Sequence, residues 1–416
     1  MRVSCLVATV LLAAMAAVRA GEWPQILGPS RNGVAAADER LADTWPAAGP
    51  RHVWRRTVGA GVAGVAVAGG RVYLFHRVDD RETLESLDAT TGRTLWSDSH
   101  PTSFRPQVGG SDGPLCTPLV HERCVVIFGA QGVLACVDAA TGRRLWSRDT
   151  HRDFGALEGY FGAGSTPLVV GRRVIVNVGG AKRNAGVVAF DLDTGETLWT
   201  ATSEPASYAT PVRAQVGGQD HVIVVTRYQC LLIEPATGTV RWTFPFGQRG
   251  PTVNAASPLV FEDGHLLVTA AYGIGSVYAA FDARAATPVW QGPESLASQY
   301  ATPIDVNGRL YCIDGRDDMP PADFKCIDRQ NGRVVWSEPG FGYGTLLFAD
   351  GKLIVVKTAG ELVLVRPNAA GIEVLARARP FADDPAGGAV RALPALAGGR
   401  LYVRDDRTLS CLDVAP

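Results

Sequence analysis

Short, continuously apolar runs recur along the chain and are separated by two-residue turn sequences. Five such turns are Gly69-Gly70, Asp263-Gly264, Asn307-Gly308, Asp350-Gly351 and Gly398-Gly399. These dipeptides favour tight hairpins, because they accept the positive φ angles that hairpin turns need. The runs that follow them, such as residues 72–75 and 353–356, suit strands buried on both faces. No convincing amphipathic helix interrupts the runs, so the pattern predicts an all-β protein.

Tryptophan marks a long repeat. Seven of the nine Trp residues share one local pattern, namely Trp54, Trp96, Trp146, Trp199, Trp242, Trp290 and Trp336. Neighbours are roughly 40–50 residues apart, and one more step reaches Leu375, which gives eight positions. A repeat of this length with four strands, A to D, is typical of a β-propeller blade. We therefore predict an eight-bladed propeller of four-stranded blades.

Turn chemistry accompanies each tryptophan. An acidic residue stands eight positions earlier in six repeats, at Asp88, Asp138, Asp191, Glu234, Asp282 and Asp328. A Thr-Gly turn, such as Thr141-Gly142, usually lies between the two. The carboxylate can accept hydrogen bonds from turn N–H groups, and glycine supplies the positive φ angle. These acids are therefore expected to be structural. A Thr-Pro step such as Thr117-Pro118 opens several units.

The two ends of the repeat region complement each other. Residues 392–413 supply strands A to C of a last blade, and residues 49–56 supply a D strand with no A to C before it. Joining them completes an eighth blade and removes two open sheet edges. We predict a propeller over residues 51–414. Residues 21–50 are then an extended clasp on the ring, anchored by Trp23 and Trp45.

The first twenty residues read as a secretory signal. Arg2 precedes an apolar run over residues 6–18, and Val18-Arg19-Ala20 offers small residues for cleavage before Gly21. An uncleaved anchor is the alternative. No later run reaches the length of a membrane span, so the mature chain is expected to be exported, without a membrane span, to the periplasm or the extracellular space.

Charge and cysteine content narrow the possible ligands. Lys and Arg total 40 against 41 Asp and Glu, so a general nucleic-acid surface is not expected. Beyond Cys5 the chain has seven cysteines, an odd number. They are interpreted first as small buried apolar residues; the alternative is disulfides, with Cys124–Cys136 and Cys312–Cys326 the first pairs to test. No CxxC motif occurs, and no metal site is predicted.

The repeats resemble a known family. The pattern Asp-x-x-Thr-Gly-x-x-Leu-Trp, found at residues 88–96, and the Thr-Pro openings are similar to the pyrroloquinoline-quinone-like (PQQ-like) repeat. The eight-unit form resembles the BamB-type outer-membrane assembly factor and the propeller of quinoprotein dehydrogenases. The resemblance implies that each repeat Trp packs between neighbouring blades. Quinoprotein dehydrogenases typically carry two adjacent cysteines near the quinone, whereas no two cysteines are adjacent here.

Binding residues are sought in the loops that join strand D to the next strand A, because propeller loops on one face commonly carry function. These loops contain ten Phe and Tyr residues. Aromatic and Arg side chains are frequent at interfaces. The candidates on this face are Arg105, Tyr160, Tyr208, Arg249, Tyr300 and Tyr343. The alternative is that the aromatic rings plug the channel and pack the loops against one another.

Two main functions follow from these features. The first is a non-catalytic binding or assembly scaffold of the cell envelope, a monomer with a protein or peptide partner on the loop face and no cofactor. The second is a PQQ-binding oxidoreductase or ligand sensor, with calcium accompanying the quinone. A hydrolase or lyase on the same scaffold is a third. The absence of adjacent cysteines favours the first, and no catalytic residue is assigned.

Overall fold

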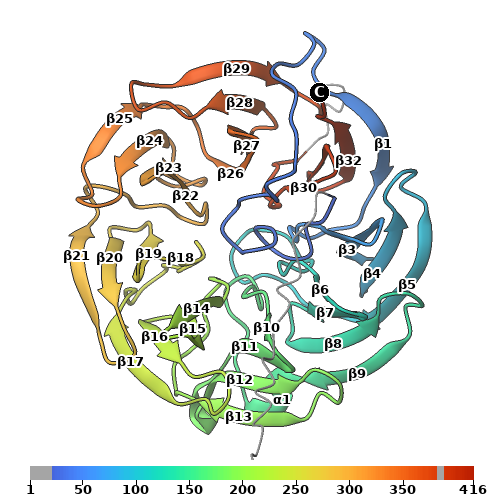
Figure 1. Cartoon of the computed structure of the whole chain (residues 1–416). Coiled ribbons are helices and arrows are strands. Elements are labelled where there is room, and N and C mark those ends of the chain that lie inside the picture. Colours follow the sequence, from blue (N-terminus) through green and yellow to red (C-terminus); the bar gives the residue numbers. More distant parts are fainter. Residues whose placement is uncertain (1–20, 382–387) are drawn as a thin grey trace, which may run out of the picture.

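The computed structural model describes residues 21–381 and 388–416, so the signal prediction for residues 1–20 lies outside the described residues. Within them the strands form eight four-stranded antiparallel sheets, with one short α-helix and one 3-10 helix. The sheets are arranged as blades in a ring (Figure 1). The predicted all-β, eight-bladed propeller is therefore confirmed.

Blades 1 to 4 follow one another along the chain. Blade 1 contains β2 (Ala66–Ala68), β3 (Arg71–Val78), β4 (Arg81–Asp88) and β5 (Thr94–Pro101). Blade 2 contains β6 (Leu119–His121), β7 (Cys124–Phe128), β8 (Val133–Asp138) and β9 (Arg144–Asp149), followed by α1 (Thr150–Phe154). Blade 3 contains β10 (Leu168–Val170), β11 (Arg173–Gly180), β12 (Ala185–Asp191) and β13 (Thr197–Ala201), with η1 (Ala181–Arg183) after β11. Blade 4 contains β14 (Val212–Val216), β15 (Gln219–Val225), β16 (Gln229–Ile233) and β17 (Val240–Pro245).

Blades 5 to 8 close the ring. Blade 5 contains β18 (Leu259–Phe261), β19 (His265–Ala270), β20 (Gly275–Phe281) and β21 (Ala286–Gly292). Blade 6 contains β22 (Ile304–Val306), β23 (Arg309–Asp314), β24 (Asp323–Asp328) and β25 (Val334–Glu338). Blade 7 contains β26 (Gly344–Ala349), β27 (Lys352–Lys357), β28 (Leu362–Arg366) and β29 (Glu373–Ala378). Blade 8 contains β30 (Ala395–Ala397), β31 (Arg400–Arg404), β32 (Thr408–Asp413) and, from the other end of the chain, β1 (Arg51–Thr57).

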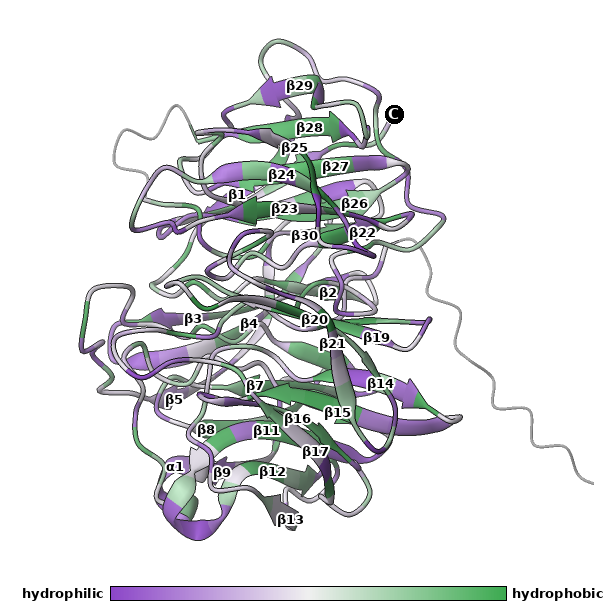
Figure 2. Cartoon of the chain, turned by 90° about the vertical axis from the view of Figure 1, so that its left-hand side faces the viewer, coloured by the Kyte–Doolittle hydropathy of each residue, from purple (hydrophilic) through white to green (hydrophobic). Residues whose placement is uncertain are grey.

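Each blade runs from a short inner strand A to an outer strand D (Figure 1). Because successive strands are antiparallel, the A–B and C–D turns lie on one side of the ring, which we call the turn face. The B–C turns and D–A connections lie on the other side, the loop face. Figure 2 shows hydrophobic residues along strands such as β7, β15 and β28, where neighbouring blades cover them.

The repeated tryptophan joins each blade to the next on the turn face. The indole Nε1 of Trp146 donates to the carbonyl oxygen of Leu192 in the following blade, at 2.8 Å. The other six repeat tryptophans donate to the equivalent C–D turn of the next blade, at Ala89, Ala139, Pro235, Asp282, Arg329 and Asn368. In five of these seven contacts the indole ring also lies on the glycine of that turn, namely Gly92, Gly142, Gly195, Gly238 or Gly332. A Cβ added at Gly142 would sit 2.7 Å from the Trp96 ring, so only glycine fits.

The repeat acid holds the same turn in shape. The Oδ1 atom of Asp138 accepts from the Thr141 hydroxyl at 2.7 Å and from the Thr141 N–H at 2.9 Å. These hydrogen bonds lower the pKa of Asp138. Gly142 then adopts a φ of 76°, a left-handed conformation that favours glycine. The Asp, Thr, Gly and Trp of the sequence repeat therefore form one docking unit between blades.

Blade 8 takes its outer strand from the start of the propeller region. Strand β1 pairs antiparallel with β32, for example Arg55 with Ser410. Trp54 of this strand then docks on the C–D turn of blade 1 through Ala89. Both ends of the repeat region thus meet in one sheet, which leaves blade 8 with four strands like the others.

The clasp of residues 21–50 crosses the middle of the ring, as the dark blue chain in Figure 1 shows. Its Trp23 and Trp45 are buried among residues of blades 1, 7 and 8. Glu39 ties it to blade 8, where its carboxylate accepts from the N–H groups of Gly398 and Gly399. Because these glycines form the A–B turn of blade 8, the clasp lies on the turn face.

Candidate functional site

The aromatic residues predicted for the loop face are mostly packed into the loops. Six of the ten are buried, namely Phe104, Phe154, Phe246, Phe341, Tyr343 and Phe381. The other four, Tyr160, Phe161, Tyr208 and Tyr300, are half-buried. An exposed aromatic surface is therefore not formed, and the alternative left open by the sequence, packing of the loops, describes these side chains better.

Two tyrosine clusters hold neighbouring loops together. The hydroxyl of Tyr208 accepts from the Phe161 N–H at 3.0 Å, and the Tyr160, Phe161 and Tyr208 rings lie in a row. The hydroxyl of Tyr343 accepts from the N–H groups of Tyr300 and Ala301, at 2.7 and 2.9 Å. Burial raises the pKa of Tyr208, Tyr300 and Tyr343, so these hydroxyls stay protonated.

The two candidate arginines of the loop face remain at the surface. Arg105 donates to the Phe104 carbonyl at 2.9 Å and pairs with Asp112 at 3.1 Å. Arg249 is exposed and has no hydrogen bond or ion pair within the part of the chain that the structure describes. Among the described residues, neither arginine has a hydrogen bond or an ion pair with the candidate tyrosines. Arg249 is the freer cation for a partner.

The central channel is occupied by the clasp itself. Arg31 is 1% exposed, and its guanidinium donates to the Thr210 hydroxyl at 2.7 Å and to the Pro211 carbonyl at 2.9 Å. It also donates to the Pro167 carbonyl, and its Nε atom donates to Gln25. Burial lowers the pKa of Arg31. The Thr-Pro steps predicted as strand openings thus also serve as acceptors for the clasp.

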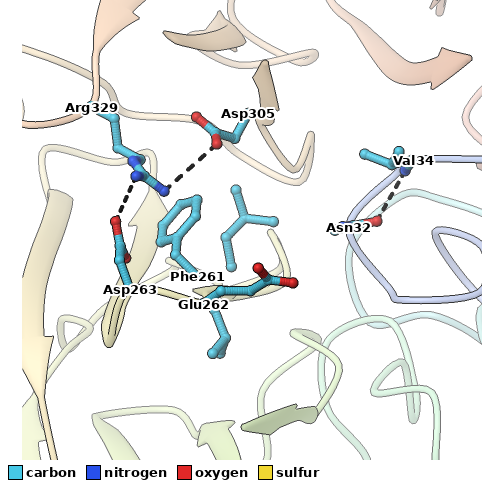
Figure 3. Close-up of a pocket in the computed structure, with 9 residues that line it drawn as sticks. Asn32, Val34, Phe261, Glu262, Asp263, Asp305 and Arg329 are labelled. Carbon is cyan, nitrogen blue, oxygen red and sulfur yellow. Dashed lines mark hydrogen bonds and ion pairs between the residues drawn. The ribbon is translucent and has the colours of Figure 1, made fainter. Parts of the chain in front are cut away.

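A surface pocket of about 370 Å³ lies beside the clasp on the turn face (Figure 3). Asn32 and Val34 of the clasp form one wall. The rest comes from blade 5, over residues 259–263, and from Asp305 and Arg329 of blade 6. This pocket has no local signature in the sequence. In the sequence Asp263 belongs to a hairpin turn, and neither Asn32 nor Glu262 stands in a binding motif.

Carboxylates outnumber cations at this pocket. Arg329 pairs with Asp263 at 2.6 Å and with Asp305 at 3.6 Å, and its guanidinium lies 4.4 Å from the centroid of the Phe261 ring. Asp263 also contacts the Nδ1 atom of His265 at 3.1 Å. Burial raises the pKa of Asp305, which the nearby Arg329 opposes. Glu262 is exposed and has no ion pair within the described residues.

The cysteines do not form the disulfides named as first tests. All seven cysteines of the described residues are buried and carry free thiols. Cys312 pairs with Lys325 across β23 and β24, which places the adjacent Cys326 on the opposite face of the sheet. Cys124 and Cys136 lie on the neighbouring strands β7 and β8 without a disulfide bond between them. The interpretation as buried apolar residues accounts for them.

A buried histidine and glutamate pair lies between blades 1 and 2. His100 contacts Glu82 at 2.9 Å, and both side chains are buried. Glu82 also accepts from the Ala130 N–H of blade 2, which makes the pair a link between blades.

Residues 21–381 and 388–416 contain no group of three or more His, Cys, Asp or Glu that could hold a metal ion. Within the same ranges no helix is long and apolar enough to cross a membrane.

A protein family and several solved structures are similar to this chain. The family model described as "Outer membrane protein assembly factor BamB" matches residues 30–184 and 183–319, more than half of the chain. Among solved structures, BamB from Moraxella catarrhalis is 17% identical, with a TM-score of 0.60 over 87% of this chain and 96% of that one. The computationally designed Ika8 protein is 14% identical, with a TM-score of 0.56 over 90% of this chain and 100% of that one.

A quinohemoprotein alcohol dehydrogenase from Comamonas testosteroni is also similar. It is 14% identical, with a TM-score of 0.48 over 97% of this chain and 82% of that one. No curated protein matches the sequence. At these identities the solved structures support the propeller fold and nothing more specific.

Proposed function

Because this chain belongs to the family described as outer membrane protein assembly factor BamB, we propose that it is a non-catalytic scaffold of the cell envelope that binds a protein or peptide partner. The observation that carries the proposal is the filled channel. A small-molecule site is normally a concave, largely enclosed cavity. Here Arg31 occupies the channel and the loop aromatics pack against one another. Within the described residues, the pocket beside the clasp lies at the surface, where a macromolecule can reach it.

Quinone binding is less well supported by the same residues. Pyrroloquinoline quinone is a flat tricarboxylate, so its site needs cations and room at the channel. The Arg31 guanidinium already donates to carbonyl and hydroxyl oxygens. The pocket beside it holds three carboxylates and one guanidinium. These donor sets do not fit the quinone, and we assign it no step.

The quinone alternative is tested by calorimetric titration of the protein with pyrroloquinoline quinone, with and without calcium. No heat of binding is the expected result. Saturable one-to-one binding at micromolar concentration would overturn the scaffold proposal, and oxidation of an alcohol with a dye acceptor would then be measured.

Export is part of the proposal and rests on residues 1–20. The full chain, expressed in its own host, is expected in the envelope or extracellular fraction with Gly21 at its N-terminus. Edman or mass-spectrometric sequencing of the N-terminus checks this. An intact Met1 on a cytosolic protein would contradict it.

The partner is tested by photo-crosslinking in the intact cell. A photoreactive phenylalanine analogue replaces Arg249 on the loop face or Glu262 on the turn face, both exposed. We expect one discrete product with the same envelope protein in repeated experiments from at least one of the two positions. Substitution at Glu196, an exposed residue of blade 3, is the control. If neither Arg249 nor Glu262 gives a crosslinked product, the scaffold proposal fails.

A further inference from the structure

The clasp binds the ring partly by strand pairing. Trp23 exchanges two backbone hydrogen bonds with Val67 of β2, at 2.7 and 2.8 Å. Pro24 accepts from the Val120 N–H of β6 at 2.8 Å. Gly33 and Ala35 flank Phe348 of β26 in a parallel bridge, with bonds of 2.8 and 2.9 Å. The inner edges of blades 1, 2 and 7 therefore accept an extended segment.

These contacts share one position in the blade. Val67, Val120 and Phe348 are each the next-to-last residue of the inner strand A. The equivalent residue of blade 5 is Val260 in β18 (Leu259–Phe261). Among the described residues, no backbone hydrogen bond joins the clasp to Val260. The inner edge of blade 5 therefore lacks the extended segment that covers blades 1, 2 and 7.

The surface pocket lies at this uncovered edge. Val260 lines it, and Asn32 and Val34 of the clasp line the opposite side (Figure 3). Leu259, Val260 and Phe261 supply apolar surface beside an exposed strand edge. This arrangement suits β-augmentation, in which main-chain bonds hold an extended peptide and pockets select its side chains.

The excess of negative charge in the pocket favours a cationic side chain. Glu262, Asp263 and Asp305 line the pocket together with one guanidinium, that of Arg329. Arg329 and His265 engage Asp263, and Asp305 lies 3.6 Å from Arg329. The Glu262 carboxylate has no counter-ion within the described residues and extends toward the gap between blade 5 and the clasp (Figure 3). A Lys or Arg side chain near Glu262 and Asp305 would balance this excess of negative charge.

We propose that this pocket binds an extended peptide segment of the partner, which pairs with β18 at Val260 and places a Lys or Arg side chain near Glu262 and Asp305. The proposal rests on the scaffold function above and adds the place and the chemistry of recognition. The clasp shows the same mode of binding within the chain, at the same position in three other blades.

The test uses a blocked synthetic pentapeptide of alternating Val and Thr with Lys at its centre. Calorimetry is expected to show saturable one-to-one binding. Two control peptides vary one feature each: Glu replaces Lys, or the backbone nitrogens on one edge are methylated. We expect no binding of the Glu peptide and at least about fivefold weaker binding of the methylated peptide.

Variants of Glu262 locate the site. Because Glu262 has no described partner, Glu262→Gln and Glu262→Lys leave the fold intact. We expect binding about threefold weaker for Glu262→Gln and at least about tenfold weaker for Glu262→Lys, as for an exposed ion pair and its reversal. Glu196→Gln and Glu196→Lys, at an exposed turn of blade 3, change the net charge equally and should bind like the wild type. Peptide binding should also slow hydrogen exchange over residues 259–263.

The possible outcomes distinguish failure of the proposed peptide site from failure of the proposed scaffold function. No saturable binding of the Lys peptide, or equal binding by Glu262→Lys and Glu196→Lys, would refute the pocket. If the cell still forms the crosslink at Arg249 when Glu262→Lys is introduced, the scaffold function stands and the pocket is not its recognition site. Binding of free lysine amide or spermidine as tight as the peptide would mean a small amine site, and would also refute strand pairing.

Discussion

The turn face and the loop face of this propeller are built by different means. On the turn face one arrangement recurs, in which an indole docks on the Asp-Thr-Gly turn of the next blade. On the loop face the connections differ from blade to blade, and each tyrosine cluster has its own contacts. Residues that recur in phase therefore belong to the architecture. Recognition is to be sought outside this repeated unit, as in the pocket where the inner edge of blade 5 faces the clasp.

The largest effect on stability is expected from loss of β1, which closes the ring. Deletion of Arg51–Thr57 removes the outer strand of blade 8 and the Trp54 contact with blade 1. The ring would then have an open edge, and scanning calorimetry should show loss of the cooperative thermal transition. Deletion of residues 21–30, which leaves β1 in place, should lower the melting temperature far less. An unchanged transition after the β1 deletion would show that the ring does not depend on this closure.

Replacement of one repeat tryptophan by alanine should strongly destabilise the contact between two blades on the turn face. Trp146→Ala removes a buried ring and its bond to Leu192, so we expect the free energy of unfolding to fall by about 3–5 kcal/mol. Phe161→Ala, at a half-buried ring of the loop face, should have a clearly smaller effect. Urea unfolding of both variants gives the comparison. Equal losses would remove the difference that we draw between the two faces.

Arg31 in the channel and Arg105 on the loop face should differ in their contribution to the free energy of unfolding. Arg31→Ala leaves the Pro211 carbonyl and the Thr210 hydroxyl without this donor in the channel, and we expect a loss of about 1–3 kcal/mol. Arg105→Ala on the exposed loop face should stay within about 0.5 kcal/mol of the wild type. Chemical unfolding measures both. If Arg31→Ala is neutral, the clasp is not anchored through the channel.

Alkaline pH should affect the loop face through its buried tyrosine, with the smallest expected effect. The pKa of Tyr343 is raised by burial above the ordinary value of 10.0, so the folded state keeps a proton that the unfolded state releases. The stability from this group is complete below pH 10 and falls as the pH rises above it. Tyr343→Phe should therefore show a shallower decline of unfolding free energy between pH 9 and 11. The same slope in both proteins would contradict this.

Much of the fold could be predicted from the sequence because its determinants are local. The acid, the Thr-Gly turn and the tryptophan lie within nine residues of one another, and their spacing reports a turn and the strands beside it. Repetition in phase then gives the number of blades. The aromatic connections were identified from the sequence as loops, although residues 150–154 of one of them form α1. Whether their rings face solvent depends on neighbouring loops. Tyr343, for instance, is buried by its contact with Tyr300 of the preceding connection.

The sequence by itself determined the repeat, the turn at each repeat acid and the all-β architecture, because neighbours in the chain fix these features. The tertiary structure decided the positions of Arg31, Glu262 and Asp305. Arg31 reaches acceptors 179 and 180 residues away, and the pocket joins the clasp to two blades that lie far along the chain. Contacts of that kind have no local signature, since closure of the ring and the path of the clasp bring the residues together.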